Sequence, residues 1–170
     1  MKELLKKLHA CKEAREWAGD KTWEEIYNTC HRGDWLLWLF QRTNPNDKRR
    51  LVLVGAHCAN TVRHLMLNER SKLAVDVAIS YGEGKATEEE LADAANEAIY
   101  VAAAYEAIYP TNVTNAAKAV IYAADAAIYA ATANAAKAAY IVRKQNQKQT
   151  ADICRKYLPI EIWNIERDEK

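Results

Sequence analysis

Alanine fills 23 of the 55 positions from 86 to 140, and this stretch constrains the fold more than any other feature of the chain. Alanine favours helix because it loses no side-chain entropy when a helix forms. Its small volume also lets helix axes approach closely. Alternating apolar and polar residues, the pattern of a half-buried strand, are almost absent from the chain. The sequence therefore predicts an all-α fold.

A chain of 170 residues is long enough for one domain with a substantial core. We expect a single bundle of seven or eight helices with a long Ala/Tyr-rich helical region towards the C-terminus. Three sections are distinguished by composition: a basic, tryptophan-rich half (1–72), an alanine-rich half (73–158) and a tail (159–170).

Local signals place the boundaries of the expected helices. Apolar residues at helical spacing predict one helix over 3–18, and a second amphipathic helix over 48–67 that follows a turn at 44–47. Two capping boxes, Thr22 with Glu25 and Thr87 with Glu90, predict helix starts. Asp34 and Ser71 are the expected N-caps of two further helices, and helix formers extend from about 111 to 158.

The most apolar segment, Trp35–Phe40, lies between basic residues in the stretch TCHRGDWLLWLFQR. A helix over this segment is apolar on almost every face, which predicts a place in the core. Its polar ends are expected to form the rim of a binding site.

The net charge of +1 conceals a strong asymmetry along the chain. Residues 1–72 carry 14 Lys and Arg against nine Asp and Glu, whereas residues 73–140 carry three against nine. The asymmetry is compatible with packing of the basic half against the acidic half, or with an anion site in the basic half.

Basic and aromatic residues cluster between positions 15 and 70, which hold seven of the ten arginines, three of the four histidines and four of the five tryptophans. Arginine binds phosphate or carboxylate with two parallel hydrogen bonds, and tryptophan and tyrosine rings can stack on a base. The candidate ligand-binding residues are Arg32, Arg49, Arg50, His57, Arg63, His64, Trp23, Tyr27 and Trp35. The alternative, an ordinary solvated basic face above buried tryptophans, remains open.

Several classes of function lack their sequence signals. No recognised catalytic motif, nucleotide-phosphate loop or zinc-type cysteine spacing occurs, so we expect no catalytic site, cofactor or metal, and Cys11, Cys30, Cys58 and Cys154 are expected to be buried free thiols. No run of 18 apolar residues and no signal peptide is present, so we expect a cytoplasmic protein without membrane contact. A near-neutral total charge disfavours long nucleic acid as a partner.

Five parts of the chain carry a resemblance to a known family: CKEAREWAGDKTWEEIYNTCHRGDWLLWL (11–39), RRLVLVGAHCANTVRHLM (49–66), ERSKLAVDVAISYGEGKATEEEL (69–91), the Ala/Tyr tract and KQTADICRKYLP (148–159). In these segments the chain resembles an all-helical family of immunity proteins found in phages and in bacterial toxin–immunity loci. The resemblance implies a protein that neutralises its target by binding, and it supplies no catalytic residues.

Three functions are compatible with these patterns. The first is sequestration of a nucleotide-like immune signal by a phage-type anti-defence protein. The second is inhibition of a protein toxin by direct contact, in which the acidic segment 83–97 covers a basic surface of the toxin. The third is a phage structural or assembly protein. The small side chains along 86–140 would allow helices of two copies to pack, so a homo-oligomer fits the pattern as well.

Overall fold

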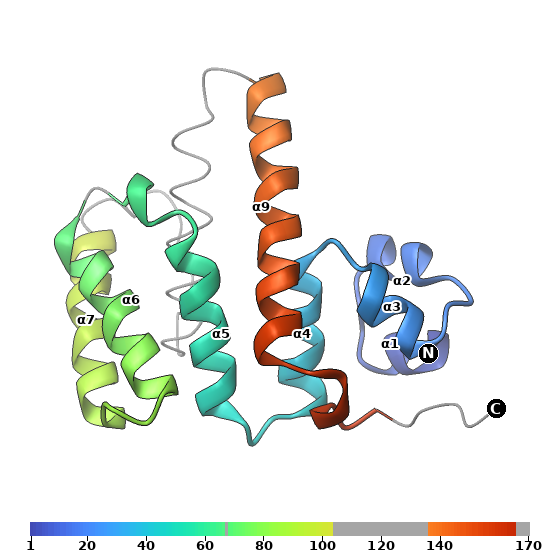
Figure 1. Cartoon of the computed structure of the whole chain (residues 1–170), viewed down its shortest axis with the longest axis horizontal. Helices are drawn as coiled ribbons and strands as arrows, with labels where there is room; N and C mark the ends of the chain where they lie inside the picture. Colours follow the sequence, from blue (N-terminus) through green and yellow to red (C-terminus); the bar gives the residue numbers. More distant parts are fainter. Residues whose placement is uncertain (67, 104–135, 166–170) are drawn as a thin grey trace.

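The computed structural model describes residues 1–66, 68–103 and 136–165, and in this part of the chain it contains helices and no strands. The all-α prediction is confirmed. Figure 1 shows the arrangement of the α-helices, which are α1 (Lys2–Lys7), α2 (Lys12–Ala18), α3 (Trp23–Thr29), α4 (Gly33–Thr43), α5 (Lys48–Asn60), α6 (Glu69–Gly82), α7 (Glu88–Ala103) and α9 (Ala136–Tyr157). Two short 3₁₀ helices, η1 (Arg63–Leu65) and η2 (Ile160–Ile162), follow α5 and α9.

Helix α5 occupies the middle of the described structure. It packs against α6 on one side and against α9 and α4 on the other, while α7 lies against α6 and the short helices α1–α3 lie beyond α4 (Figure 1). Its buried residues accordingly divide between two clusters. Val54 and Cys58 join the core formed with α1–α4 and α9, and Val52, Ala56 and Ala59 join the core formed with α6 and α7.

Two glycines allow close contacts between these helices. A Cβ atom on Gly33, the first residue of α4, would lie 2.6 Å from the carbonyl carbon of Thr150 in α9. A Cβ atom on Gly82, at the end of α6, would lie 2.9 Å from the Cα atom of Leu53 in α5. Real side chains do not approach that closely, so both helix pairs depend on glycine.

Both predicted capping boxes are confirmed. The amide of Glu25 donates to the hydroxyl of Thr22 (3.2 Å), and the amide of Thr22 donates to the carboxylate of Glu25 (2.7 Å). Thr87 and Glu90 make the same reciprocal pair, at 3.1 and 2.7 Å. The predicted turn before α5 also ends in a cap, because Asp47 accepts a hydrogen bond from the amide of Arg50.

The predicted single helix over 3–18 is wrong, because the chain ends α1 at Lys7 and begins α2 at Lys12. His9 adopts a positive φ of 59°, and the amide of Ala10 donates to the carbonyl of Leu5. Together with the hydrogen bond from the amide of His9 to the carbonyl of Lys6 (3.0 Å), this bond forms a Schellman motif. Glycine normally occupies the position of His9, so no residue type at this point predicts the break.

Three other predicted boundaries differ from the structure. Arg32, and not Asp34, is the N-cap of α4, and Asp34 lies in the first turn, where its carboxylate binds Arg32. Asn68, and not Ser71, caps α6. Helix α5 ends at Asn60 and not at 67, because the amides of Thr61 and Val62 bond the carbonyls three residues back, at 3.2 and 3.1 Å. The hydroxyl of Thr61 also donates to the carbonyl of Cys58 (2.7 Å).

The apolar segment of α4 is only partly buried. Leu36, Leu37, Leu39 and Phe40 lie in the core, with Phe40 completely inaccessible, but Trp35 and Trp38 are half-buried at the edge of that core. Residues 111–135 of the predicted helical stretch 111–158 lie outside the described residues, and α9 forms the rest of it as far as Tyr157. In the part of the chain described, no helix has the length and apolar character needed to cross a bilayer.

Candidate functional site

Two of the predicted aromatic ligand contacts lie in the core. The side chain of Trp23 is 4 % exposed, and its ring centroid lies 4.8 Å from that of Trp163. Tyr27 is 8 % exposed, and its hydroxyl donates to the carbonyls of Arg155 (3.2 Å) and Leu158 (3.1 Å). Neither ring has a free face for a ligand, so the prediction that they form a stacking surface is wrong.

Three of the predicted arginines already bind carboxylates of their own chain. Arg32 binds both carboxylate oxygens of Asp34 (2.9 and 2.7 Å). Arg63 binds both oxygens of Asp76 (2.7 and 2.8 Å), and Arg50 binds Asp47 (2.8 Å). An external anion would have to displace these carboxylates, and so the three arginines are poor ligand contacts.

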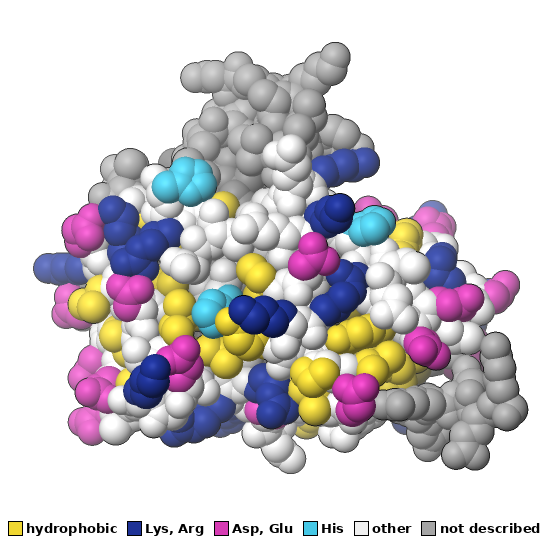
Figure 2. Space-filling model, viewed as in Figure 1, with side chains coloured by type: hydrophobic (Ala, Val, Ile, Leu, Met, Phe, Trp, Pro, Cys, Tyr) yellow, Lys and Arg dark blue, Asp and Glu magenta, His cyan; other side chains and the backbone are white. Residues whose placement is uncertain are grey.

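The remaining ring of the predicted set, Trp35, has its own local partners. The guanidinium of Arg32 lies 4.4 Å from the centroid of the Trp35 ring, and the ring of Trp17 lies 5.9 Å away. His64 is exposed in η1, beyond the end of α5. The nine predicted residues are therefore spread over α3, α4, α5 and η1 and do not surround one hollow. Figure 2 likewise shows Lys and Arg side chains interspersed with Asp and Glu on the visible face.

Arg49 and His57 are predicted residues that lie on the same helix, with cationic and aromatic groups from α6 and α9 beside them. They lie eight residues apart on α5, which places them on neighbouring parts of one helix face about 12 Å apart along the axis. We define the α5 site as Arg49 and His57 together with Tyr81 from α6 and with Lys156 and Tyr157 from α9.

Arg49 is held in place by Tyr81. Its Nη1 atom donates to the carbonyl oxygen of Tyr81 (2.7 Å), and its guanidinium lies 4.5 Å from the centroid of the Tyr81 ring. Both contacts are with neutral groups. Within the part of the chain that the structure describes, Arg49 forms no ion pair with a carboxylate. Its charge therefore remains available to an anion.

The other end of the α5 site is a stack of two rings. The imidazole of His57 lies parallel to the ring of Tyr157, with an interplanar angle of 11° and centroids 4.4 Å apart. The Nζ atom of the exposed Lys156 lies 4.9 Å from the Tyr157 centroid, and among the described residues it has no carboxylate partner. This end combines flat aromatic surface with an available positive charge.

The local environment keeps His57 neutral. Burial lowers the pKa of His57, the positive charge of Lys156 lowers it further, and Glu83 opposes both effects. The Nε2 atom of His57 is inaccessible and has no hydrogen-bond partner. An imidazolium at this position would place a second positive charge beside Lys156 with nothing to bind its Nε2 proton.

Sequence reasoning missed Tyr81, Lys156 and Tyr157. Their positions depend on tertiary packing, because Tyr157 follows His57 by 100 residues. The one available signal was the adjacent basic and aromatic residues at the end of the last helix, the same combination that singled out residues 15–70. For Tyr81 we find no such signal.

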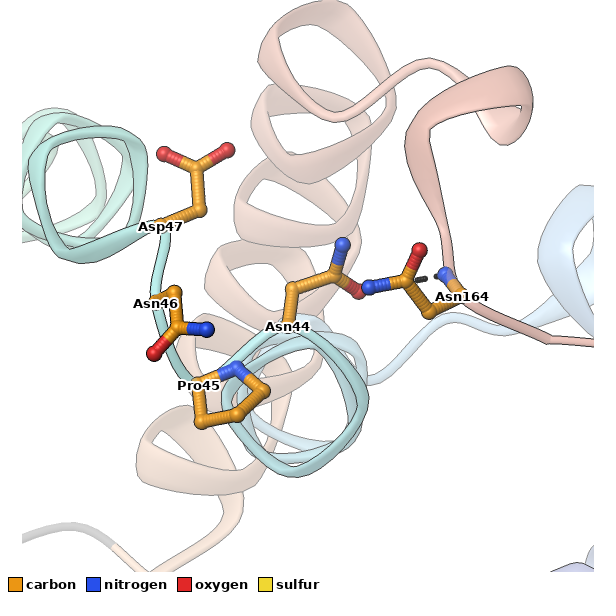
Figure 3. A pocket seen from close by; sticks show the side chains of 5 residues that line it. All are labelled: Asn44, Pro45, Asn46, Asp47 and Asn164. Carbon is orange, nitrogen blue, oxygen red and sulfur yellow. Dashed lines mark hydrogen bonds between the residues drawn. The ribbon is translucent and has the colours of Figure 1, made fainter.

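A separate polar depression of about 310 Å³ lies where the α4–α5 loop meets the tail (Figure 3). It is lined by Asn44, Pro45, Asn46, Asp47 and Asn164. Most of its polar groups serve the fold: Asn44 donates to the carbonyl of Ile162 (2.8 Å), Asn164 donates to the carbonyl of Thr43 (3.1 Å), and Asp47 binds Arg50. None of the nine predicted residues lines it.

Among the described residues, no group of three or more His, Cys, Asp or Glu side chains is placed to hold a metal ion. Comparison with family models, curated proteins and solved structures finds no match to this chain.

Proposed function

We propose that this protein is a non-catalytic binding protein that sequesters a small, anionic, nucleotide-like ligand at the α5 site. The observation that carries the proposal is that two cations of the α5 site, Arg49 and Lys156, each lie beside an aromatic ring and have no carboxylate partner among the described residues. The other predicted arginines lack this property. In the setting implied by the resemblance to immunity proteins, the ligand is a nucleotide immune signal and the protein acts by removing it.

The spacing of the site favours an extended ligand. Arg49 and His57 are separated by two helical turns, about 12 Å, with Lys156 at the His57 end. A single phosphate cannot contact both ends, whereas a ligand with a diphosphate and a base or second sugar can. Because Arg49 is already held by the Tyr81 carbonyl, little side-chain entropy is lost when an anion binds it.

A ligand screen tests the proposal. Thermal unfolding is followed with ADP-ribose, cyclic mono- and dinucleotides and inorganic phosphate, and the best ligand is titrated by calorimetry. We expect stabilisation by at least one extended nucleotide and a smaller effect of inorganic phosphate. Arg49→Gln should weaken binding at least tenfold, which corresponds to about 1.4 kcal/mol.

Arg50→Gln is the matched control. It removes the same charge from the adjacent residue, but from an arginine that binds Asp47. It should leave ligand affinity within about twofold of the unchanged protein. Equal loss of affinity in both variants, or no stabilisation by any of these anions at millimolar concentration, refutes the proposal.

A second function, inhibition of a protein toxin by direct contact, is favoured by the surface of α7. Glu88, Glu89 and Asp93 are exposed, and within the described structure they form no ion pair. Residues 86–117 contain no Lys or Arg. Such a surface complements a basic protein. Pull-down with the product of the neighbouring gene separates the two functions, because only toxin inhibition requires a stable protein partner. The double variant Glu88→Lys, Glu89→Lys should abolish binding of that partner.

The third function, phage assembly, predicts large homo-oligomers. Light scattering on the purified protein tests it, and a monomer or dimer at high concentration would exclude it.

A further inference from the structure

Three of the four cysteines lie in the core where α4, α5 and α9 meet. Cys30, Cys58 and Cys154 are 2 %, 8 % and 1 % exposed, whereas Cys11 is exposed, contrary to the expectation that all four are buried. None of the three buried thiols belongs to the α5 site, although Cys58 directly follows His57 and Cys154 precedes Tyr157 by one helical turn.

The thiols of Cys58 and Cys154 lie next to each other. The Sγ atom of Cys58 donates to the carbonyl oxygen of Thr150 at 3.9 Å. In α9 that carbonyl accepts the amide of Cys154, one turn later, so the Cys58 sulfur lies beside the backbone of Cys154. The Sγ atom of Cys154 donates to the carbonyl oxygen of Gly33 at 3.5 Å, and Gly33 packs directly against Thr150, so both sulfurs lie at the same contact between α4 and α9. Sulfurs that meet at one contact are placed to form an S–S bond.

The two thiols differ in reactivity. The neighbouring Cys58 thiol and burial raise the pKa of Cys154 well above its usual value, so Cys154 remains a protonated thiol at neutral pH. Cys58 is the more accessible of the pair. An oxidant that reaches the interior therefore meets Cys58 first, and Cys154 is placed to react with the product.

We propose that Cys58 and Cys154 are an oxidation site at which peroxide forms a disulfide that links α5 to α9. The Cys58 thiolate attacks one peroxide oxygen, so that an S–O bond forms, the O–O bond breaks and hydroxide leaves as water. The Cys154 sulfur then attacks the Cys58 sulfenic acid; the S–S bond forms, the S–O bond breaks and the oxygen leaves as water with the Cys154 proton. Two thiols are oxidised, and one peroxide is reduced to two waters.

The link has consequences for stability and for the α5 site. It closes a loop of 96 residues, and a loop of this length strongly restricts the unfolded chain, so the midpoint of thermal unfolding should rise by about 5 °C or more. It also fixes α5 against α9 next to the His57–Tyr157 stack. Because the thiols are buried, we expect formation over hours and not seconds.

Peptide mapping tests the inference. The full chain is treated with hydrogen peroxide under native conditions, the remaining thiols are alkylated, and the products are analysed by mass spectrometry without reductant. We expect an intact mass lower by about 2 Da before alkylation and a peptide that joins Cys58 to Cys154. Cys11→Ser and Cys30→Ser should retain this linked peptide, whereas Cys58→Ser should lose it.

The mapping of the unsubstituted protein gives a result even if Cys58→Ser fails to fold. A predominant Cys30–Cys154 link, a dimer joined through Cys11, or sulfinic acid on Cys58 with Cys154 still free would each overturn the inference. It stands independently of the proposed ligand, because the linked peptide is measured without any ligand.

Discussion

Gly33→Ala tests the packing of α4 against α9, on which the core of the protein depends. The added Cβ atom would overlap Oγ1 of Thr150, and it would lie 2.6 Å from the Thr150 carbonyl carbon and 2.7 Å from the amide nitrogen of Ala151. Two of these atoms belong to the α9 backbone, which cannot rotate away. Since an ordinary contact is about 3.4 Å, the two helices must separate locally by about 0.8 Å.

Overpacking of this kind costs about 3 kcal/mol, because the core around Gly33 must also loosen. For a chain of this size the loss corresponds to a fall of roughly 9 °C in the midpoint of thermal unfolding. Urea unfolding followed by far-UV circular dichroism measures the free energy directly. The slope with denaturant should be unchanged, which would show that the variant has the same fold and less stability.

Thr150 supplies the matched control. Thr150→Ala alone removes the hydroxyl that donates to Gln147 and should cost less than about 1 kcal/mol. In combination with Gly33→Ala it removes the Oγ1 contact but leaves both backbone contacts, so we expect only partial recovery. Full recovery in the double variant, or a Gly33→Ala protein within about 0.5 kcal/mol of the original, would refute the close packing of α4 on α9.

Three further predictions concern other contacts. Arg155→Met should lower the free energy of unfolding by about 3 kcal/mol, because Arg155 donates to the carbonyls of Tyr27 and Cys30 at the end of α3. An unchanged midpoint of urea unfolding would contradict the stabilising role of these two hydrogen bonds. Because the fold lowers the pKa of His57, the stability that the neutral imidazole contributes is complete above the ordinary pKa of 6.5 and is lost as the pH falls below that value. His57→Gln should therefore flatten this part of the pH profile of the thermal unfolding midpoint, and a profile identical to that of the original protein would contradict the burial of a neutral imidazole. Thr22→Ala should cost about 1 kcal/mol by removing the acceptor for the Glu25 amide, and thermal unfolding of Thr29→Ala, which loses a helix hydroxyl without a capping role, is the comparison.

The helical character of the chain and several helix ends could be predicted because their causes are local. Thr22 with Glu25 and Thr87 with Glu90 are capping boxes whose hydrogen bonds join residues three apart, and Asp47 caps α5 in the same way. The break at His9 could not be predicted, since it places a residue with a Cβ atom at a positive φ that is normally left to glycine.

Most residues of the predicted ligand site do not lie together in the structure, for a physical reason. The clustering of arginine and tryptophan residues along the sequence does not determine which carboxylate or ring each side chain contacts in the folded chain. Asp76 binds Arg63 from thirteen residues away, and Trp163 packs on Trp23 from the other end of the chain. Arg49 and His57 each lie beside an aromatic partner, and those partners come from α6 and α9.

The half-buried Trp35 and Trp38 illustrate the same limit in the core. Their segment is uniformly apolar in sequence, but α4 buries only Leu36, Leu37, Leu39 and Phe40 of it. The indole rings lie partly exposed, and the cations of Arg32 and Arg42 cover them at 4.4 and 5.8 Å. Local sequence could not tell a central helix from one with an exposed edge.

The central claim is that the α5 site binds an extended anion next to the His57–Tyr157 stack. The most direct measurement is a nuclear magnetic resonance titration of the four imidazole side chains with ADP-ribose or the best nucleotide of the screen. We predict that the His57 resonances move and saturate together with the calorimetric binding curve, while those of His9 and His31 do not change. Binding that leaves the His57 resonances unmoved, or that moves those of His31 or His64 instead, would contradict the account.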